Sequence, residues 1–375
     1  MYRADVDDLI IVPVKSSFRS GVAGIAIILA SGGAARGAGA QIVRVELRDS
    51  STAAPVVGVL VSALDSVGQR RADGLSGDAG VVTLRLAASG TYTISIRRIG
   101  LRPRQVSGVV VDVGSARTLS IDLNSVQQQL PPVRVVAAGT CGRAPEGNDR
   151  TGALWEQISL ALRAATITLR EGVTLPPLRM IERMNDLSAT LEERSSVITR
   201  DLQGAGRLVQ ADDPDSLAAL GYVRRDDDGS MSYFAPDEQV LLSDAFLATH
   251  CFSTPKRDAD ALLAELQFKP VRGRRVADVE GTAYVDVNSG ELRRISYRYV
   301  ASRSLMPVNA EYAGGDVFLR RLPNGAWIVN KWSIRMPLVG RSLAGSQLVV
   351  NGYREVAGVV QEVRRNIPVP QPPDR

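Results

Sequence analysis

The chain contains very few of the residues that build catalytic and metal sites. Its 375 residues include one histidine, His250, and two cysteines, Cys141 and Cys251. A zinc site with two histidines and a glutamate therefore cannot be assembled from this chain. It also has no Walker, Rossmann or serine-hydrolase motif. We expect a protein that is not an enzyme and has no catalytic residues, no cofactor and no metal.

Aromatic residues and long apolar runs are scarce as well. Aromatics make up 5% of the chain and all hydrophobic residues 45%, so aliphatic side chains must fill most of the core. The apolar run from Val22 to Ala30 is far shorter than the roughly 20 residues that a membrane-spanning helix needs. We therefore expect no transmembrane helix.

The short apolar run has the flanks of a secretory signal peptide. Lys15 and Arg19 precede it, and Ala38-Gly39-Ala40 follows as a cleavage motif. This pattern predicts a signal peptide over residues 1–40 and an exported protein, periplasmic or associated with the outer membrane. The acidic residues before Lys15 do not suit a signal peptide, which indicates a start of translation downstream of Met1.

The positive charge is spread along the chain. Lysine and arginine number 45 against 40 acidic residues, which gives a net charge of +5. A nucleic-acid-binding protein more often concentrates its basic residues and interleaves them with aromatics. We interpret the charge as a solvated surface and expect neither a nucleic-acid partner nor a polyanion site.

The region after the signal peptide has the pattern of short strands. Val43, Val45 and Leu47 alternate with charged residues, as in a strand with one buried face. Further strands are expected at 56–64, 81–86, 91–96, 109–111 and 119–123, with glycine-containing turns between several of them. About seven short strands at this spacing predict a β-sandwich over residues 41–124.

Several motifs in this region fall in a recognisable order. They are Asp49…Thr52…Pro55-Val-Val, Asp78-Ala-Gly80-Val-Val, Ser89-Gly90-Thr-Tyr92-Thr-Ile and Arg98-Ile-Gly100-Leu. Together they resemble the carboxypeptidase regulatory-like domain, which implies a transthyretin-like sandwich at residues 42–123 and no catalysis. Leu101 departs from the family, which usually has an aromatic residue there. Gly80, Gly90 and Gly100 are interpreted as backbone requirements rather than ligand contacts.

Residues 125–150 are rich in glutamine, proline and glycine, which is typical of a linker. Within them, 130–137 resembles the segment that follows this module in TonB-dependent outer-membrane receptors, where an energy-coupling protein contacts it. The rest of the chain is too short and wrongly patterned for a receptor barrel. A plain linker is the alternative, and contact with a coupling protein stays open.

Residues 151–366 are expected to form an α+β domain with a curved antiparallel sheet. A helix begins at Thr151 as its N-cap, a short helix ends at Gly221, and Pro255 to Leu266 is predicted to be helical. Two hairpins turn at 288–290 and 323–325. Edge strands are expected at 347–355 and 359–364, followed by a Pro-rich tail over 367–375. The fold class is therefore mainly β.

This second domain has two further resemblances. The consecutive hairpins resemble the half-barrel of periplasmic lipoprotein carriers. The block Tyr233–Asp237, Leu241–Phe246 and His250–Phe252 is similar to uncharacterised proteins of GC-rich Gram-negative bacteria that pair it with the same first module. That family implies no activity.

The two cysteines are the strongest candidates for a specific interaction. Exported proteins oxidise such pairs, so Cys141 and Cys251 are expected to form a disulfide that ties the linker to the second domain; two unpaired thiols are the alternative. His250 beside Cys251 also suggests a thiol protease or a metal site, but no second histidine or cysteine completes either one.

The acidic candidates have ordinary explanations. Residues 226–229 and 286–290 resemble fragments of calcium loops but lack the full spacing with its closing glutamate, so turn chemistry explains both. Glu192, Glu193 and Asp237 could act as catalytic carboxylates, although their spacing defines no pair.

The sequence favours a non-catalytic binding protein of the periplasm or the outer-membrane periphery, with a protein or a glycan of the cell envelope as its partner. The alternative is a lipid or lipoprotein carrier with a weak association with membranes, whose curved sheet over 280–360 covers an apolar cavity. An enzyme with an unrecognised carboxylate site is a third hypothesis. The oligomeric state stays open.

Overall fold

The computed structural model describes residues 41–99, 103–124, 140–146, 149–170, 177–186, 194–202, 211–227, 230–255, 260, 262–300, 313–341 and 348–361. The predicted signal peptide, the segment 130–137, Glu192, Glu193 and the Pro-rich tail lie outside these residues. Gly39–Arg375 forms one compact unit.

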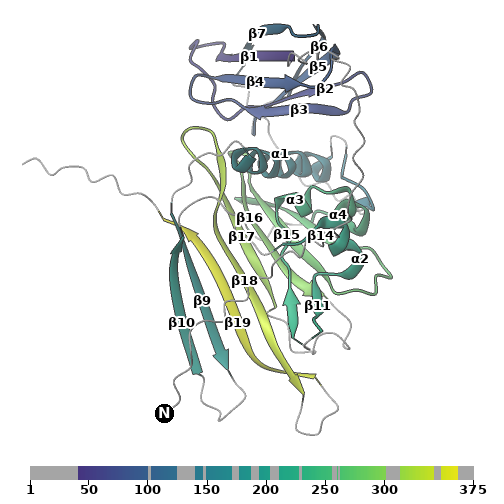
Figure 1. Ribbon diagram of the computed structural model, residues 1–375, viewed down its shortest axis with the longest axis vertical. Coiled ribbons are helices and arrows are strands. Elements are labelled where there is room, and N and C mark those ends of the chain that lie inside the picture. Colours follow the sequence, from purple (N-terminus) through teal and green to yellow (C-terminus); the bar gives the residue numbers. More distant parts are fainter. Residues whose placement is uncertain are drawn as a thin grey trace, which may run out of the picture. The chain divides into compact units, whose positions relative to one another are not determined.

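The first part of the chain is a seven-stranded sandwich, as the sequence predicts (Figure 1). One sheet has the order β4-β1-β7 and the other β3-β2-β5-β6. The strands are β1 (Gln41–Asp49), β2 (Leu60–Leu64), β3 (Arg70–Leu75), β4 (Val81–Leu86), β5 (Gly90–Arg97), β6 (Arg104–Val111) and β7 (Ala116–Leu123).

Strand β1 shows why this stretch folds as a sandwich. Val43, Val45 and Leu47 are buried on one face, and the residues between them are more exposed. β1 pairs antiparallel with β4 and parallel with β7, and its apolar face packs into one core with the other sheet. Gly80, at φ +69°, lies against the backbone of Leu47, where a side chain would not fit. The expected backbone role of this glycine is therefore confirmed.

Strand β3 was not among the strands that the sequence predicts. It begins with Arg70 and Arg71, both exposed, so apolar residues do not alternate along it. It lies at the edge of its sheet and pairs only with β2 in the described part of the chain. Charged edge strands of this kind are common because they resist pairing with other chains.

The second part of the chain is a curved antiparallel sheet of ten described strands, in the order β10-β9-β19-β18-β17-β16-β15-β14-β13-β8 (Figure 1). The strands are β8 (Thr140–Cys141), β9 (Leu178–Asp186), β10 (Arg194–Leu202), β13 (His250–Ser253), β14 (Leu263–Pro270), β15 (Asp278–Asp286), β16 (Leu292–Val300), β17 (Gly314–Arg321), β18 (Trp327–Arg341) and β19 (Leu348–Val360). A small separate hairpin joins β11 (Val223–Arg225) and β12 (Met231–Tyr233).

Four described helices accompany the sheet: α1 (Arg150–Arg170), α2 (Pro214–Leu220), α3 (Glu238–Leu241) and α4 (Asp244–Thr249). The prediction that α2 ends at Gly221 is confirmed. Thr151 is not the N-cap of α1. The Asp149 carboxylate accepts from the Gly152 N–H at 2.8 Å, which is the role of a cap.

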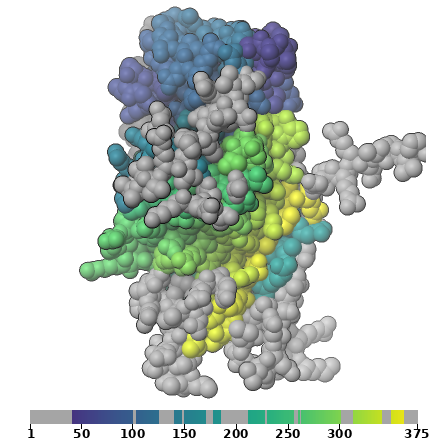
Figure 2. Space-filling view, turned by 180° about the vertical axis from the view of Figure 1, so that it is seen from behind, coloured from purple at the N-terminus to yellow at the C-terminus, as the bar shows by residue number. Residues whose placement is uncertain are grey.

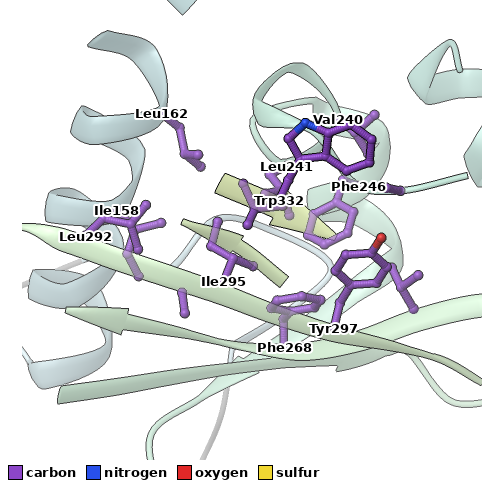
Figure 3. Close-up of a cluster of buried hydrophobic side chains, with 14 of the residues drawn as sticks. Ile158, Leu162, Val240, Leu241, Phe246, Phe268, Leu292, Ile295, Tyr297 and Trp332 are labelled. Atoms are coloured by element: carbon purple, nitrogen blue, oxygen red, sulfur yellow. The ribbon is translucent and has the colours of Figure 1, made fainter. Parts of the chain in front are cut away.

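Helix α1 is buried along most of its length. Leu154, Ile158 and Leu162 belong to one core with residues of α3, α4 and the inner face of the sheet. Figure 3 shows Ile158 and Leu162 in this core. Leu160 and Ile167, also on α1, pack against Leu60 of the sandwich.

None of the described helices combines the length and the apolar composition that a membrane-spanning helix requires.

Three aromatic side chains on the inner face each lie opposite a glycine on the neighbouring strand. The pairs are Phe268 with Gly281, Tyr297 with Gly315 and Trp332 with Gly358. Each ring occupies space that a side chain on its glycine would need. Such aromatic–glycine pairs pin the register of a sheet.

Two predictions for the second domain are wrong. Residues 263–266, within the predicted helix Pro255–Leu266, belong to β14, whose buried Ala264, Leu266 and Phe268 alternate along the strand. The two predicted edge strands are replaced by the single strand β19, which lies between β18 and β9 and is internal to the sheet. The two predicted hairpins, β15–β16 and β17–β18, are confirmed.

Candidate functional site

The cysteines form a disulfide, as the sequence predicts. Cys141 on β8 and Cys251 on β13 are direct partners in an antiparallel pair. The bond closes a loop between positions separated by 110 residues. Because the Cys251 sulfur is bonded to another sulfur, it is not the free thiolate that a cysteine nucleophile requires.

His250 is buried rather than open to a substrate; its exposed fraction is 0%. Its ring stacks on Phe246, with 3.8 Å between the ring centroids. Nδ1 lies 3.0 Å from the carbonyl of Phe246, and Nε2 lies 3.1 Å from the carbonyl of Val279 and 3.3 Å from Oδ1 of Asp278. Both ring nitrogens are therefore held in place by polar groups of the protein itself.

Asp278 lies between two positively polarised groups in the same buried network. Its carboxylate contacts His250 on one side and Arg274 on the other, and it also accepts from the Val279 N–H. Burial by itself would raise the pKa of Asp278, but the hydrogen bonds and nearby positive groups hold it below its ordinary value. Arg274 also donates to the carbonyl of Ala218 in α2. The network therefore ties α2, β13 and β15 together.

The other acidic candidates have structural roles. The Asp286 carboxylate accepts from the N–H groups of Asn288 and Ser289 in the β15–β16 turn. Asp237 is the N-cap of α3 and accepts from the Val240 N–H. The residues that the structure describes contain no group of three or more metal-ligating side chains. Turn chemistry therefore accounts for residues 286–290, whereas residues 228–229 of the other fragment are not described.

A polar hollow lies on the outer face of the sheet. Figure 2 shows the molecule from behind the view of Figure 1, with the second part of the chain in teal to yellow. The volume of the hollow is about 430 Å³, within the range of about 300–1,000 Å³ typical of small-molecule sites. Residues of β13, β14, β15 and β16 line it: Ser253, Gln267, Phe268, Lys269, Glu280, Gly281, Thr282, Ser296, Tyr297 and Arg298.

One row of polar side chains runs perpendicular to the strands, and its first four members line this hollow. Each member is the direct cross-strand partner of the next, from β13 to β18. The row is Ser253, Gln267, Thr282, Ser296, Asp316 and Ser333. Hydroxyl, amide and carboxylate groups therefore form a single row across the sheet. Within it, the Ser296 hydroxyl donates a hydrogen bond to the Asp316 carboxylate.

Longer side chains stand on both sides of this row. On one side are Lys269, Glu280 and Arg298, and Arg298 donates to Glu280 at 2.6 Å. On the other side, Arg294 lies over the ring of Tyr284, 4.4 Å from its centroid. The ladder continues across the sheet with Phe318 and Lys331, whose Nζ lies 5.3 Å from the Phe318 ring centroid.

This hollow could not be predicted from the sequence because its residues come from strands that are far apart in the chain. Alternation marks one face of each strand as polar, but only the register shows that the hydroxyl-bearing positions are partners. The aromatic residues at 284 and 318 are a signal that could have been noticed, because a large ring on the polar face of a strand is unusual.

Comparison with protein families identifies the first module. Residues 42–124 match the carboxypeptidase regulatory-like domain, which confirms the predicted resemblance for that region. No curated protein matches the chain. The resemblance of the second domain to uncharacterised bacterial proteins is not confirmed.

Solved structures give distant likenesses. A cohesin–X-dockerin complex of Acetivibrio cellulolyticus matches at 24% identity, covers 23% of this chain and has a TM-score of 0.17. This chain spans only about half of that one, 53% of its length. A candidate carbohydrate-binding protein of Bacteroides uniformis matches at 9% identity over 69% of this chain and 95% of its own, with a TM-score of 0.20. Likenesses this weak carry no functional argument.

Proposed function

We propose that this chain is an exported, non-catalytic binding protein whose second domain holds a glycan in the polar hollow of its sheet. The observation that carries the proposal is the unbroken row of hydroxyl, amide and carboxylate groups across six strands. Sugars present hydroxyl groups along a chain, and paired donors and acceptors at strand spacing match such a ligand.

Side chains beside the row add to this fit. Tyr284 and Phe318 lie outside the hollow itself, and their rings give apolar surface next to the polar row, each with a cation over it. Fixed polar groups and apolar surface together are typical of sites that orient a small ligand. Because these groups stand on paired strands, their positions are set before a ligand arrives.

Two observations support binding rather than catalysis. The Cys251 sulfur is in a disulfide, and His250 is fully buried among carbonyl and carboxylate oxygens. Cys251, the candidate nucleophile, and His250, the candidate base, thus both have structural roles. The carrier alternative needs space beneath the sheet, but aromatic and aliphatic side chains fill the inner face under α1, α3 and α4 (Figure 3).

The test is a binding screen of the purified protein against soluble fragments of cell-envelope polysaccharides, followed by calorimetry on each hit. Thr282→Val removes one hydroxyl from the centre of the row at nearly constant volume, so we expect the affinity to fall about fivefold to tenfold. Thr118→Val, at an exposed position on β7, is the matched control and should bind normally. If both variants bind the glycan equally tightly, the hollow is not the glycan site.

Export is tested separately. Cell fractionation should recover the protein outside the cytoplasm, with a mature N-terminus at Gln41 as the cleavage motif predicts. Recovery of the chain in the cytoplasm with residues 1–40 attached would contradict export without affecting the glycan proposal.

A further inference from the structure

A second groove lies at the edge of the sandwich. Arginines dominate its lining, whereas the lining of the polar hollow is mixed. The groove lies beside the edge strands β3 and β4 and the last residue of α1, and its volume is about 720 Å³. The seven lining residues are Arg70, Arg71, Ala72, Asp73, Thr83, Arg85 and Arg170. Four arginines from three elements of the chain thus converge on one space.

The carboxylates near the groove neutralise only part of this charge. Asp73 is the one acidic lining residue. Arg170 donates to it at 2.7 Å, whereas the nearest nitrogen of Arg70 is 4.0 Å away. Arg71 pairs with Asp65 at 2.6 Å. Arg85 has no ion pair with any residue that the structure describes.

The guanidinium group of Arg163 adds to the excess of positive charge near the groove. Arg163 lies two helical turns before Arg170 on α1 and has no ion pair within the described part of the chain. Burial, together with the charges of Arg70 and Arg97, lowers the pKa of Arg163 to about 10. The positive groups here therefore repel one another, and an anion in the groove would relieve that repulsion.

Protection of an edge strand explains only some of these arginines. Charged side chains on an edge strand discourage its pairing with another chain, which accounts for arginines on β3 and β4. Such protection does not account for Arg170, which comes from α1, or for a concave space walled by guanidinium groups. Guanidinium groups present forked donors that match the oxygens of phosphate, and several of them around one space are typical of phosphate recognition.

We propose that the groove between β3 and β4 binds a phosphate group carried by a saccharide. The phosphate follows from the four arginines, and the saccharide rests on the glycan binding proposed above. The proposal adds a second ligand site, where the first domain meets the end of α1, and a charge on its ligand. The arginines are scattered along the sequence, which predicts no polyanion site, but the fold brings them together.

Glucose 1-phosphate is the probe, and its binding to the purified protein is measured by calorimetry at 50 mM and 200 mM salt. We expect binding that weakens at the higher salt concentration, with no binding of glucose. Arg85→Gln should weaken binding about tenfold, and it leaves the fold intact because Arg85 is exposed and unpaired among the described residues. Arg117→Gln, an exposed arginine on β7 of the same module, is the control.

Two other outcomes would overturn the proposal. If Arg85→Gln binds as tightly as the unchanged protein, the groove is not the site. If phosphatidylglycerol vesicles bind more tightly than glucose 1-phosphate, and Arg85→Gln abolishes that binding, the phosphate belongs to a lipid and the saccharide assignment is wrong. Thr282→Val should leave glucose 1-phosphate binding unchanged, which separates this site from the hollow.

Discussion

Tyr297 on β16 lies directly opposite Gly315 on β17, and its ring covers the glycine. A Cβ atom on Gly315 would lie 2.7 Å from the Tyr297 hydroxyl oxygen and closer still to the carbonyl oxygen of Ser333. The Tyr297 ring can therefore lie in this position only because residue 315 has no side chain.

We expect Gly315→Ala to lower the free energy of unfolding by about 1–3 kcal/mol, because the inserted methyl group overpacks the inner face of the sheet. Urea denaturation followed by tryptophan fluorescence measures this loss. Gly77→Ala is the control, since a Cβ atom at Gly77 would meet nothing within 4 Å. A Gly315→Ala protein as stable as the Gly77→Ala protein would contradict the role of the aromatic–glycine pair.

The disulfide should stabilise the second domain strongly because it closes a long loop. Replacing both Cys141 and Cys251 with serine is expected to cost about 2–5 kcal/mol. Urea unfolding of the double variant, beside the oxidised and the reduced unchanged protein, measures this value. The reduced protein and the double variant should agree. Alkylation of two free thiols in unreduced protein would show that the bond does not form.

Asp278 should make stability depend on pH in the acidic range. Its pKa in the folded protein is below the ordinary value of 3.8. The ionised Asp278 carboxylate therefore stabilises the folded protein above about pH 4. This stabilisation is lost as the pH falls through the lower pKa of the folded state. Asp278→Asn should cost about 3–5 kcal/mol at neutral pH, because the variant leaves a buried partner charge uncompensated.

The difference in unfolding free energy between the unchanged protein and Asp278→Asn should shrink as the pH falls below about 4. Asp122→Asn, at an exposed position on β7, is the control and should show little difference at any pH. A constant penalty for Asp278→Asn across the acidic range would mean that the ionised carboxylate is not what stabilises the network.

The elements that the sequence predicts well are those with local signals. The hairpin turn ending at Gly290, the helix end at Gly221 and the alternation in β1 each depend on neighbouring residues alone. β3 lacks alternation because its arginines are exposed at an edge. The sequence predicts an edge position for β19, whereas its position between β9 and β18 depends on pairing with β9 residues more than 160 positions away.

The candidate sites were harder to predict than the fold. Cys141 and Cys251 could be paired because the chain offers no other choice of cysteine. The hollow depends on strand register and the arginine groove on which strands lie at edges, and neither follows from local sequence. Both gather residues that are far apart in the chain, such as Ser253 and Ser296 in the hollow, or Arg71 and Arg170 in the groove.

The covalent bond between β8 and β13 also has a mechanical consequence. β8 has only two residues, Thr140 and Cys141, and by hydrogen bonds alone such a short strand would peel from the sheet under a small pull. With Cys141 bonded to Cys251, a force applied through the linker loads β13 directly. Tension on the first module, such as an anchored partner would exert, is then carried by the sheet without first detaching β8.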